Sequence, residues 1–431
     1  MRVIHFSTFD TEGGAGGAAF QLHKSFIAEG IDSLMLVKFK KSNDKTVISI
    51  SSPIFNNKIL QYLKRNPLTY FIFFKISSLL KKFGKNNFFL KFNSNTSSTL
   101  FHQIEKNIQG ADIICLHWID GFLSTDLLKK IYKKTNAPIV WVLQDIEPLT
   151  GGCHYTNGCQ GFTQSCGNCQ QLESSEENDL SRIVWQQKKA DLSGLNITLI
   201  SPSSWVQEKI KESSLFKHSR IENIFLSIDD NIFKTEDSIQ IRKRLNLPTK
   251  CHLIFFGAQS FSDKRKGMDY LTKSIEILKD VIIEKDPTLL ESIIFLSAGR
   301  ENIDLNKHFK HRHLGWIDTP LAMSEIFKAA DIFACPSIED AGPVMINQAI
   351  ACGTPVVAFH VGVAQDLITS SSRGRLITNY NAKEFAEGLY DIISKNKPAI
   401  KFKNDNYECR PNIITKKYLD LFKKLLSENK H

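Results

Sequence analysis

Residues Ile338–Phe359 read IEDAGPVMINQAIACGTPVVAF, and this stretch carries clear local structure signals. Pro343 suits the first turn of a helix. Proline has no backbone N–H, and the N–H groups of the first turn have no partner within the helix in any case. Gly353 suits the left-handed residue that ends a helix, and the apolar run TPVVAF after it is typical of a buried strand. The stretch therefore predicts a short helix followed by a buried strand.

The start of this predicted helix is a natural seat for an anion. Its unpaired amides and the positive end of the helix dipole attract a group such as phosphate, and Gly342 allows the backbone to approach closely. Glu339 and Asp340 stand just before this seat, and carboxylates repel phosphate. They are better suited to hydroxyl groups attached to the phosphate, as on a sugar. The alternative is that Asp340 only caps the helix.

The length and composition describe an ordinary two-domain protein. A chain of 431 residues exceeds what one core usually organises. MRVIHFSTF is too short an apolar run for a signal peptide, and no run is long enough to cross a membrane. The nine cysteines, without a secretory signal, predict reduced thiols in a cytoplasmic protein.

Predicted strands alternate with predicted helices twice along the chain. The first series runs from Arg2 to about Phe225, and the second restarts at His252 after a polar crossing at 229–250. This order predicts an α/β protein with two Rossmann-like domains, whose parallel sheets face each other across a cleft. We expect domains at 1–228 and 229–410, with a final helix at 411–431 that packs back either on the first domain or on the second.

The net charge of +10 is concentrated in one segment. Residues 45–104 contain no Asp or Glu but nine Lys or Arg residues, together with many phenylalanines. A basic, aromatic surface suits an anionic membrane, so we expect peripheral contact with the inner face of the plasma membrane. Nucleic acid is a weaker candidate, because the chain lacks the signature of a nucleic-acid-binding module. A solvated surface with its phenylalanines in the core remains an open alternative.

Four cysteines lie in one short loop, at 151–169. The last two form a Cys-x-x-Cys pair, which fits a structural zinc site, and His154 is a spare ligand. Free thiols are the alternative. The predicted ligands are Cys153, Cys159, Cys166 and Cys169.

Two further stretches suit phosphate binding. The run TEGGAGGAAF follows the first predicted strand, so Gly13 and Gly14 could cradle a phosphate, or they could serve only a tight turn. In the second half, Lys264, Arg265 and Lys266 lie between a strand and a helix, where they could neutralise a departing diphosphate. A solvated run of charge is the alternative there.

The order of these pieces resembles the retaining glycosyltransferases of the GT-B fold, specifically glycosyltransferase family 4, over nearly the whole chain. The motifs that carry the resemblance are EGGAGGAA, PSSW, FFGA followed by KG, AADIFACPS, and EDAGPVMINQAIACGTPVVAFHVGVAQDLI. The resemblance implies that the first domain binds the acceptor and the second binds a nucleotide-diphosphate sugar. It implies catalytic roles for Asp340 and Lys266, with His117 as a further catalytic candidate outside the family's pattern, and donor-binding roles for Gly13, Gly14, Gln259, Arg265, Gly342, Pro343, Val344 and Gln348.

Several positions depart from the commoner pattern of that family. Asp340 and Gln348 stand where the family has two glutamates, which contact the sugar hydroxyls and the ribose. Both can still bond to hydroxyl groups. The family's arginine near Gln259 is missing, and Arg265 is its expected substitute. Gln144 stands where the family often has a histidine, so His117 is the remaining candidate, unless it is a core histidine.

The resemblance implies a hexosyltransferase of surface polysaccharide biosynthesis. The expected partners are a nucleotide-diphosphate sugar and a glycan or polyprenyl-linked acceptor, and no cofactor is required for catalysis. One alternative is a non-catalytic subunit that binds a nucleotide sugar, which Gln144 and Gln348 suggest. The other alternative is a nucleotide-sugar epimerase on the same fold.

Overall fold

The computed structural model describes residues 1–50, 94–305, 307–395 and 407–429. Its chain divides into two compact units. The first unit consists of Met1–Pro202, Val206–Ile224 and Thr415–His431, and the second of Ser203–Trp205 and Phe225–Ile414.

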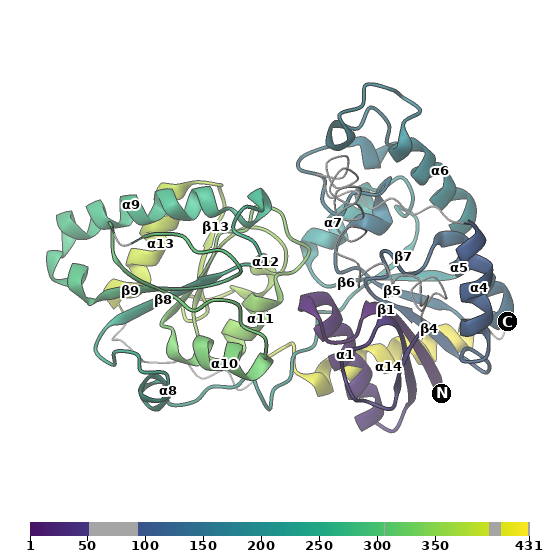
Figure 1. The fold of residues 1–431 in the computed structure, drawn as a ribbon, viewed down its shortest axis with the longest axis horizontal. Coiled ribbons are helices and arrows are strands. Elements are labelled where there is room, and N and C mark those ends of the chain that lie inside the picture. The colour runs from purple at the N-terminus through teal and green to yellow at the C-terminus, as the bar shows by residue number, and fades with distance from the viewer. Residues whose placement is uncertain (51–93, 306, 396–406, 430–431) are drawn as a thin grey trace, which may run out of the picture. The chain divides into compact units, whose positions relative to one another are not determined.

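The first unit is built on a parallel sheet (Figure 1). Among the described residues, seven strands follow the order β3-β2-β1-β4-β5-β6-β7, and every neighbouring pair is parallel. The strands are β1 Arg2–Phe9, β2 Asp32–Phe39, β3 Val47–Ser49, β4 Ile113–Leu116, β5 Ile139–Val142, β6 Ile197–Ser201 and β7 Arg220–Asn223. The order reverses between β1 and β4, and ligands bind at such reversals, outside the carboxyl ends of the strands.

Helices follow most strands of this sheet. They are α1 Gly13–Ala28, α4 Ser94–Glu105, α5 Thr125–Thr135, α6 Leu180–Leu192, α7 Ser204–Glu212 and α14 Pro411–Glu428. Phe26 of α1 packs edge-to-face on Tyr418 and Phe422, so the last helix shares the core of the first unit. All three of these aromatic side chains are buried.

Helix α1 starts at Gly13, so the glycine-rich run that the sequence analysis treats as a loop or tight turn forms the first turn of this helix. At Gly16 a side chain would meet the backbone oxygen of Phe9 at 3.3 Å, so this glycine permits close packing of the helix on β1.

The second unit has a second parallel sheet. Within the described residues its six strands follow the order β10-β9-β8-β11-β12-β13. They are β8 His252–Gly257, β9 Ile293–Ala298, β10 Lys310–His313, β11 Ile332–Cys335, β12 Val356–Phe359 and β13 Gly374–Ile377. The predicted α/β class, with a parallel sheet in each half of the chain, is confirmed.

Helices cover both faces of the second sheet. They are α8 Ser238–Arg244, α9 Met268–Lys285, α10 Pro320–Ala329, α11 Val344–Ala351, α12 Ala364–Leu367 and α13 Ala382–Lys395. Leu271 of α9 and Phe385 of α13 belong to one core cluster, whereas Phe327 of α10 and Ile350 of α11 belong to the other. The helices α9 and α13 therefore cover one face, and α10 and α11 cover the opposite face (Figure 1).

A buried ion pair ties α8 to this sheet. Arg242 is completely buried, and its Nη2 lies 2.6 Å from Oδ2 of Asp331. The same guanidinium donates to the carbonyl oxygens of Ala329 and Cys251 at 2.9 and 2.8 Å. Asp331 also accepts the amide of Leu253 at 2.7 Å, so the pair joins α8 to the starts of β8 and β11.

Most of the basic, phenylalanine-rich segment 45–104 lies outside the described residues. Its described ends form the edge strand β3 and the helix α4. In the described part of the chain, no helix has the length and apolarity needed to span a bilayer.

Candidate active site

The sequence-predicted donor residues of the second unit gather at the carboxyl ends of β8 and β11. A short 3₁₀ helix, Lys264–Lys266, follows β8, and the carboxylate of Asp263 caps it by accepting the amide of Arg265. The ammonium of Lys266 lies 2.5 Å from Oδ2 of Asp340, which stands after β11. Because β8 and β11 are adjacent and parallel, these residues meet although 74 positions separate Lys266 from Asp340.

Asp340 is a buried anion held between two cations. Only 5 % of it is exposed, and burial by itself raises the pKa of its carboxyl group. The charges of Lys266 and Arg265 outweigh that effect, so the pKa of Asp340 lies below its ordinary value. Arg265 lies 4.0 Å from the carboxylate and also donates to the carbonyl oxygen of Glu339 at 3.0 Å. The site therefore holds an ionised carboxylate beside two partly exposed cations.

The start of α11 lies directly beside this cluster. Pro343 precedes the first helical residue, Val344, and the amide of Gly342 donates to Oδ1 of Asp340 at 3.2 Å. Gly353 has φ +74° just after the helix, so the predicted left-handed stop is confirmed. The carboxylate of Asp340 thus accepts a hydrogen bond from the amide of Gly342, one of the amides that we expect from the sequence to bind a diphosphate.

Two residues that sequence reasoning missed support this site. A side chain at Gly362 would meet the carbonyl oxygen of Asp340 at 2.7 Å, so the loop after β12 packs tightly against the site. Glu301, after β9, accepts the amides of Phe261 and Ser262, and it thereby fixes the loop that carries Gln259. Neither residue has a local sequence signal, because its partners come from other loops.

Gln259 and Gln348 belong to the loop and the helix that flank the cluster in the chain. Gln259 is exposed in the loop between β8 and the 3₁₀ helix, and Gln348 is half-buried on α11. Gly13 and Gly14 are exposed in the first turn of α1, in the other unit.

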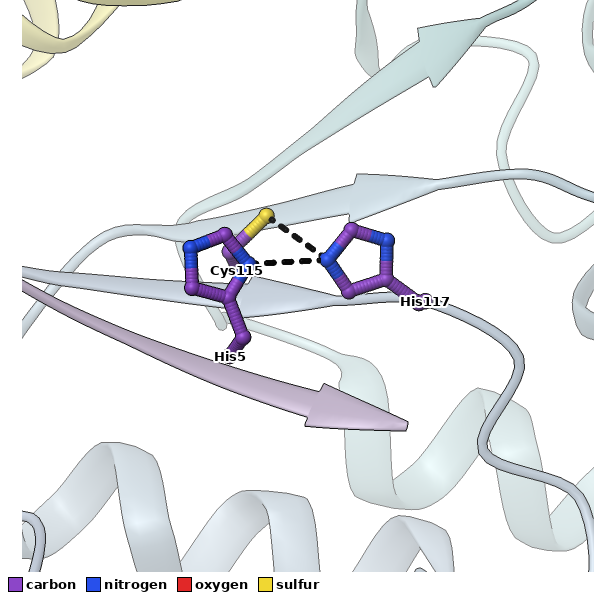
Figure 2. Close-up of side chains that lie close together, drawn as sticks. All are labelled: His5, Cys115 and His117. Atoms are coloured by element: carbon purple, nitrogen blue, oxygen red, sulfur yellow. Dashed lines mark hydrogen bonds between the residues drawn. The ribbon is translucent and has the colours of Figure 1, made fainter. Parts of the chain in front are cut away.

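His117 lies in the core of the first unit. It is 2 % exposed, its Nε2 lies 2.9 Å from Nδ1 of His5, and the sulfur of Cys115 is 3.7 Å from the same atom (Figure 2). Burial lowers the pKa of His117 to about 3, so its imidazole is neutral at pH 7. The sequence leaves two roles open for His117, a catalytic residue or a core histidine. Its position in the structure favours the core histidine.

A small pocket lies where β4 and β5 end. Its lining includes His117, Trp118, Asp120, Gln144, Asp145 and Glu147. Gln144 donates to the carbonyl oxygen of Ala15 and accepts the amide of Trp118, at 2.9 and 3.0 Å. The residue that replaces the family's histidine therefore connects β5 to the first turns of α1 and to the end of β4.

His154 lies against two carboxylates of this pocket's lining. Its Nδ1 lies 2.6 Å from Oδ2 of Asp145, and its Nε2 lies 3.6 Å from Oδ2 of Asp120. Burial lowers the pKa of His154, but the two carboxylates outweigh burial and raise it to about 10. The side chain is therefore an imidazolium at pH 7, held between two carboxylates.

Comparison with known proteins shows which protein family the second unit matches. Residues 250–395 match the family model described as "Glycosyl transferases group 1", and this range contains the whole Lys266–Asp340 cluster. A colanic acid biosynthesis glycosyl transferase of Escherichia coli K12 is 22 % identical over 416 residues, which cover 93 % of this chain and 91 % of that protein. A D-inositol 3-phosphate glycosyltransferase of Stackebrandtia nassauensis is 26 % identical, over 39 % of each chain.

Solved structures share the fold over the whole length. The sucrose-phosphate synthase of Thermosynechococcus elongatus superposes with a TM-score of 0.64 at 15 % identity, covering 99 % of this chain and all of that one. Anabaena HepE, whose structure contains UDP and glucose, gives a TM-score of 0.57 at 14 % identity, covering 100 % and 97 %. The predicted GT-B fold and transferase activity are confirmed, and the chain is a GT-B glycosyltransferase that resembles family 4.

Proposed function

We propose that this glycosyltransferase moves a hexosyl unit, with retention of configuration, from a nucleotide-diphosphate sugar to a glycan or lipid-linked glycan in surface polysaccharide biosynthesis. The observation that carries the proposal is the contact of Lys266 with Asp340 at the start of α11. In this proposal the cation binds the diphosphate and the adjacent carboxylate accepts the sugar hydroxyls.

The chemistry of the site supports a donor that carries two negative charges. Lys266 and Arg265 keep 25 % and 15 % of their side chains exposed, so both can turn toward a ligand. When a diphosphate takes up their charge, Asp340 becomes available to accept sugar hydroxyls. Gln348 offers an amide to the ribose without adding negative charge.

The comparisons supply a consistent class of substrate. HepE of Anabaena is solved with UDP-glucose, and WaaG, with a TM-score of 0.55 at 14 % identity, is titled a glycosyltransferase of lipopolysaccharide biosynthesis. The full-length E. coli relative is named for colanic acid biosynthesis. A nucleotide sugar and a polysaccharide acceptor are therefore the substrates to test first.

A thermal-shift screen of nucleotide sugars tests the donor. A specific donor at about a hundred times its Kd should stabilise the protein by about 2.7 kcal/mol, which raises Tm by roughly 5–10 °C. Turnover is then measured with and without glycan acceptors, and NMR of the anomeric proton of the product reports retention. The Lys266→Ala protein is the control for binding at this site.

Each alternative function has its own outcome in this experiment. A donor that binds tightly but is not consumed with any acceptor indicates a non-catalytic binding subunit. Conversion of the donor into another nucleotide sugar without an acceptor indicates an epimerase. If no nucleotide sugar shifts Tm, the proposed donor site is wrong.

We further propose that the basic segment 45–104 binds the anionic inner face of the plasma membrane. The proposal rests on composition, because most of this segment lies outside the described residues. Each exposed Lys contributes about 1 kcal/mol on anionic lipid, so reversing Lys81, Lys82 and Lys85 to Glu should release the protein from anionic vesicles at low salt.

A charge-matched variant controls for the loss of net charge. Lys243, Lys250 and Lys273 are exposed on the second unit, and reversing these three should leave most vesicle binding intact. If wild-type protein ignores anionic vesicles, or if both triple variants behave alike in flotation, the segment is not a specific membrane contact.

A further inference from the structure

Two central strands of the first unit place three possible metal ligands on one face of the sheet. His5 of β1 and Cys115 of β4 are direct partners across the parallel pair. His117 lies two residues beyond Cys115, and its amide continues the ladder by donating to the carbonyl oxygen of Phe6 at 2.9 Å. Because side chains alternate between the two faces of a strand, Cys115 and His117 point to the same side, and Figure 2 shows His5 there with them.

The ligand atoms of these three residues lie at separations that suit a metal ion. Nδ1 of His5 is 2.9 Å from Nε2 of His117, and the same Nε2 is 3.7 Å from the sulfur of Cys115. Among the described residues, this is the one set of three His, Cys, Asp or Glu residues whose ligand atoms all lie within 4.8 Å of one another. We propose that His5, Cys115 and His117 bind one Cu(I) ion through two nitrogens and one sulfur.

The spacing suits an ion with three ligands in one plane. With metal–nitrogen bonds of about 2.1 Å and a metal–sulfur bond of about 2.3 Å, such a site puts nitrogen and sulfur roughly 3.8 Å apart. The sulfur of Cys115 and Nε2 of His117 already have nearly this separation. The two nitrogens would lie roughly 3.6 Å apart, so the imidazole rings move apart by about 0.7 Å when the ion replaces the hydrogen between them.

Hydrogen bonding alone does not account for two imidazoles in this core. His5 and His117 are 0 % and 2 % exposed. Their remote nitrogens, Nε2 of His5 and Nδ1 of His117, have no hydrogen-bond partner among the described residues. A neutral imidazole carries one hydrogen, so the bond between the two rings uses one ring hydrogen and leaves the other unpaired. Buried polar atoms are normally paired, so an ion between the rings gives both histidines a role that their hydrogen bonds do not.

Two described side chains beside the cluster leave the ligand number at three. The ring of His23 lies 5.5 Å from the ring of His5. However, the two nitrogens of His23 are engaged with the hydroxyls of Ser33 and Thr46, at 2.7 and 2.8 Å. Phe26 packs on the ring of His5 with 5.4 Å between the ring centres. A hydroxyl-bonded imidazole and an apolar ring therefore border the cluster, which favours an ion that binds three ligands.

Charge selects a monovalent ion over a divalent one. Burial lowers the pKa of both imidazoles, so the two histidines are neutral ligands. The phenol of Tyr418, which faces Cys115, is also neutral, because burial raises its pKa well above the ordinary value. The thiolate of Cys115 is therefore the one anionic ligand of the set. Cu(I) with one thiolate has no net charge, whereas Zn²⁺ would leave a positive charge in the core, and thiolate is a ligand that selects Cu(I).

Binding exchanges one proton for the ion. The thiol of Cys115 releases its hydrogen to solvent, the copper–sulfur bond forms, and the oxidation state of the copper does not change. The hydrogen shared by the two imidazoles moves to the remote nitrogen of the ring that carries it, so both rings stay neutral. His117 lines the small pocket where β4 and β5 end, which gives the ion a route to the cluster from that side.

The cysteine-rich loop 151–169 is the weaker candidate for a metal site. The whole loop belongs to the described residues, and no three of its four cysteines have their sulfurs within 4.8 Å of one another. One of the four, Cys159, is exposed. The zinc site at Cys153, Cys159, Cys166 and Cys169 therefore stays a prediction from the sequence.

A competition titration of the full-length protein tests the proposal. Cu(I) is supplied without oxygen or added thiol, as its coloured complex with bicinchoninate, and the loss of colour counts the ions taken up. Cys115→Ala and His5→Phe should each take up about one Cu(I) fewer per chain than the wild-type protein. Two controls should match the wild type: Cys352→Ala, at a buried cysteine of the second unit, and Cys159→Ser, at the exposed cysteine of the loop. Equal uptake by the wild type and Cys115→Ala would overturn the proposal.

X-ray absorption at the copper edge of the loaded wild-type protein gives a second test, which does not depend on variants folding. We expect about two nitrogen ligands and one sulfur ligand for each copper. A spectrum with sulfur ligands alone would assign the copper to the cysteine-rich loop and refute the cluster. Loading with equal amounts of Cu(I) and Zn²⁺, followed by elemental analysis, tests the choice of ion, and zinc held in place of copper would contradict it. Because these readouts do not require turnover, their results are independent of the proposed transferase function.

Discussion

Replacing Lys266 with alanine should lower kcat/KM for the nucleotide sugar about a hundredfold. The ammonium of Lys266 is the cation nearest to the buried carboxylate of Asp340, and it stands beside the start of α11, where the leaving diphosphate gains charge. Without it, the developing charge has Arg265 as its remaining side-chain cation in this cluster. Initial rates over a range of donor concentrations measure the change.

Lys264→Ala is the matched control, because Lys264 is exposed in the same 3₁₀ helix. It should leave kcat/KM within a few-fold of the wild-type value. Equal losses in both variants would mean that only the general positive charge of this turn matters. An unchanged rate in Lys266→Ala would remove Lys266 from the donor site.

The stability of the same variants separates binding from folding. Lys266→Ala leaves the buried Asp340 with less compensation of its charge, so the free energy of unfolding should fall. Adding Asp340→Asn removes that charge and should recover part of the stability without recovering the rate. Recovery of both would indicate that Lys266 acts only by supporting the fold.

Replacing Arg242 with alanine should lower the free energy of unfolding of the second unit by about 3–5 kcal/mol. The substitution leaves the carboxylate of Asp331 buried without its cation, and it removes the donors to the carbonyl oxygens of Ala329 and Cys251. For a unit of this size the expected fall in Tm is roughly 10 °C. Denaturant unfolding and calorimetry measure the effect.

Arg244 supplies the control on the same helix. Its side chain is 58 % exposed and lies 3.0 Å from Glu325, so Arg244→Ala should cost at most about 1 kcal/mol. A double replacement, Arg242→Met with Asp331→Leu, removes both charges and should recover much of the lost stability. If Arg242→Ala unfolds no more easily than Arg244→Ala, the buried pair does not hold α8 to the sheet.

Local signals in the sequence determined the class of the fold and the ends of several elements. Apolar runs of strand length alternating with longer amphipathic segments predict parallel α/β sheets, because that order forces crossover connections. Pro343 and Gly353 bound α11 because their backbone preferences act within one turn. The first turn of α1 was predicted less well, since glycine disfavours helix and a glycine-rich run is typical of a loop, whereas the structure places this run in the helix.

The sequence also proposed the donor residues, but through the resemblance to family 4 rather than through spacing. Asp340 and Lys266 lie 74 residues apart, and nothing between them indicates a contact. They meet because β8 and β11 are neighbours in a sheet whose order departs from the order of the chain. Adjacent parallel strands end at the same edge, so their following loops converge.

Only the tertiary structure decided which polar side chains are buried and with whom. The run IRKRL gives no reason to bury Arg242 and expose Arg244; the position of Asp331 at the start of β11 makes the difference. Gln144 similarly bonds to Ala15, 129 residues away. Burial of a polar group is stable only when partners from other elements satisfy it, and those partners are set by the sheet order, which no local pattern encodes.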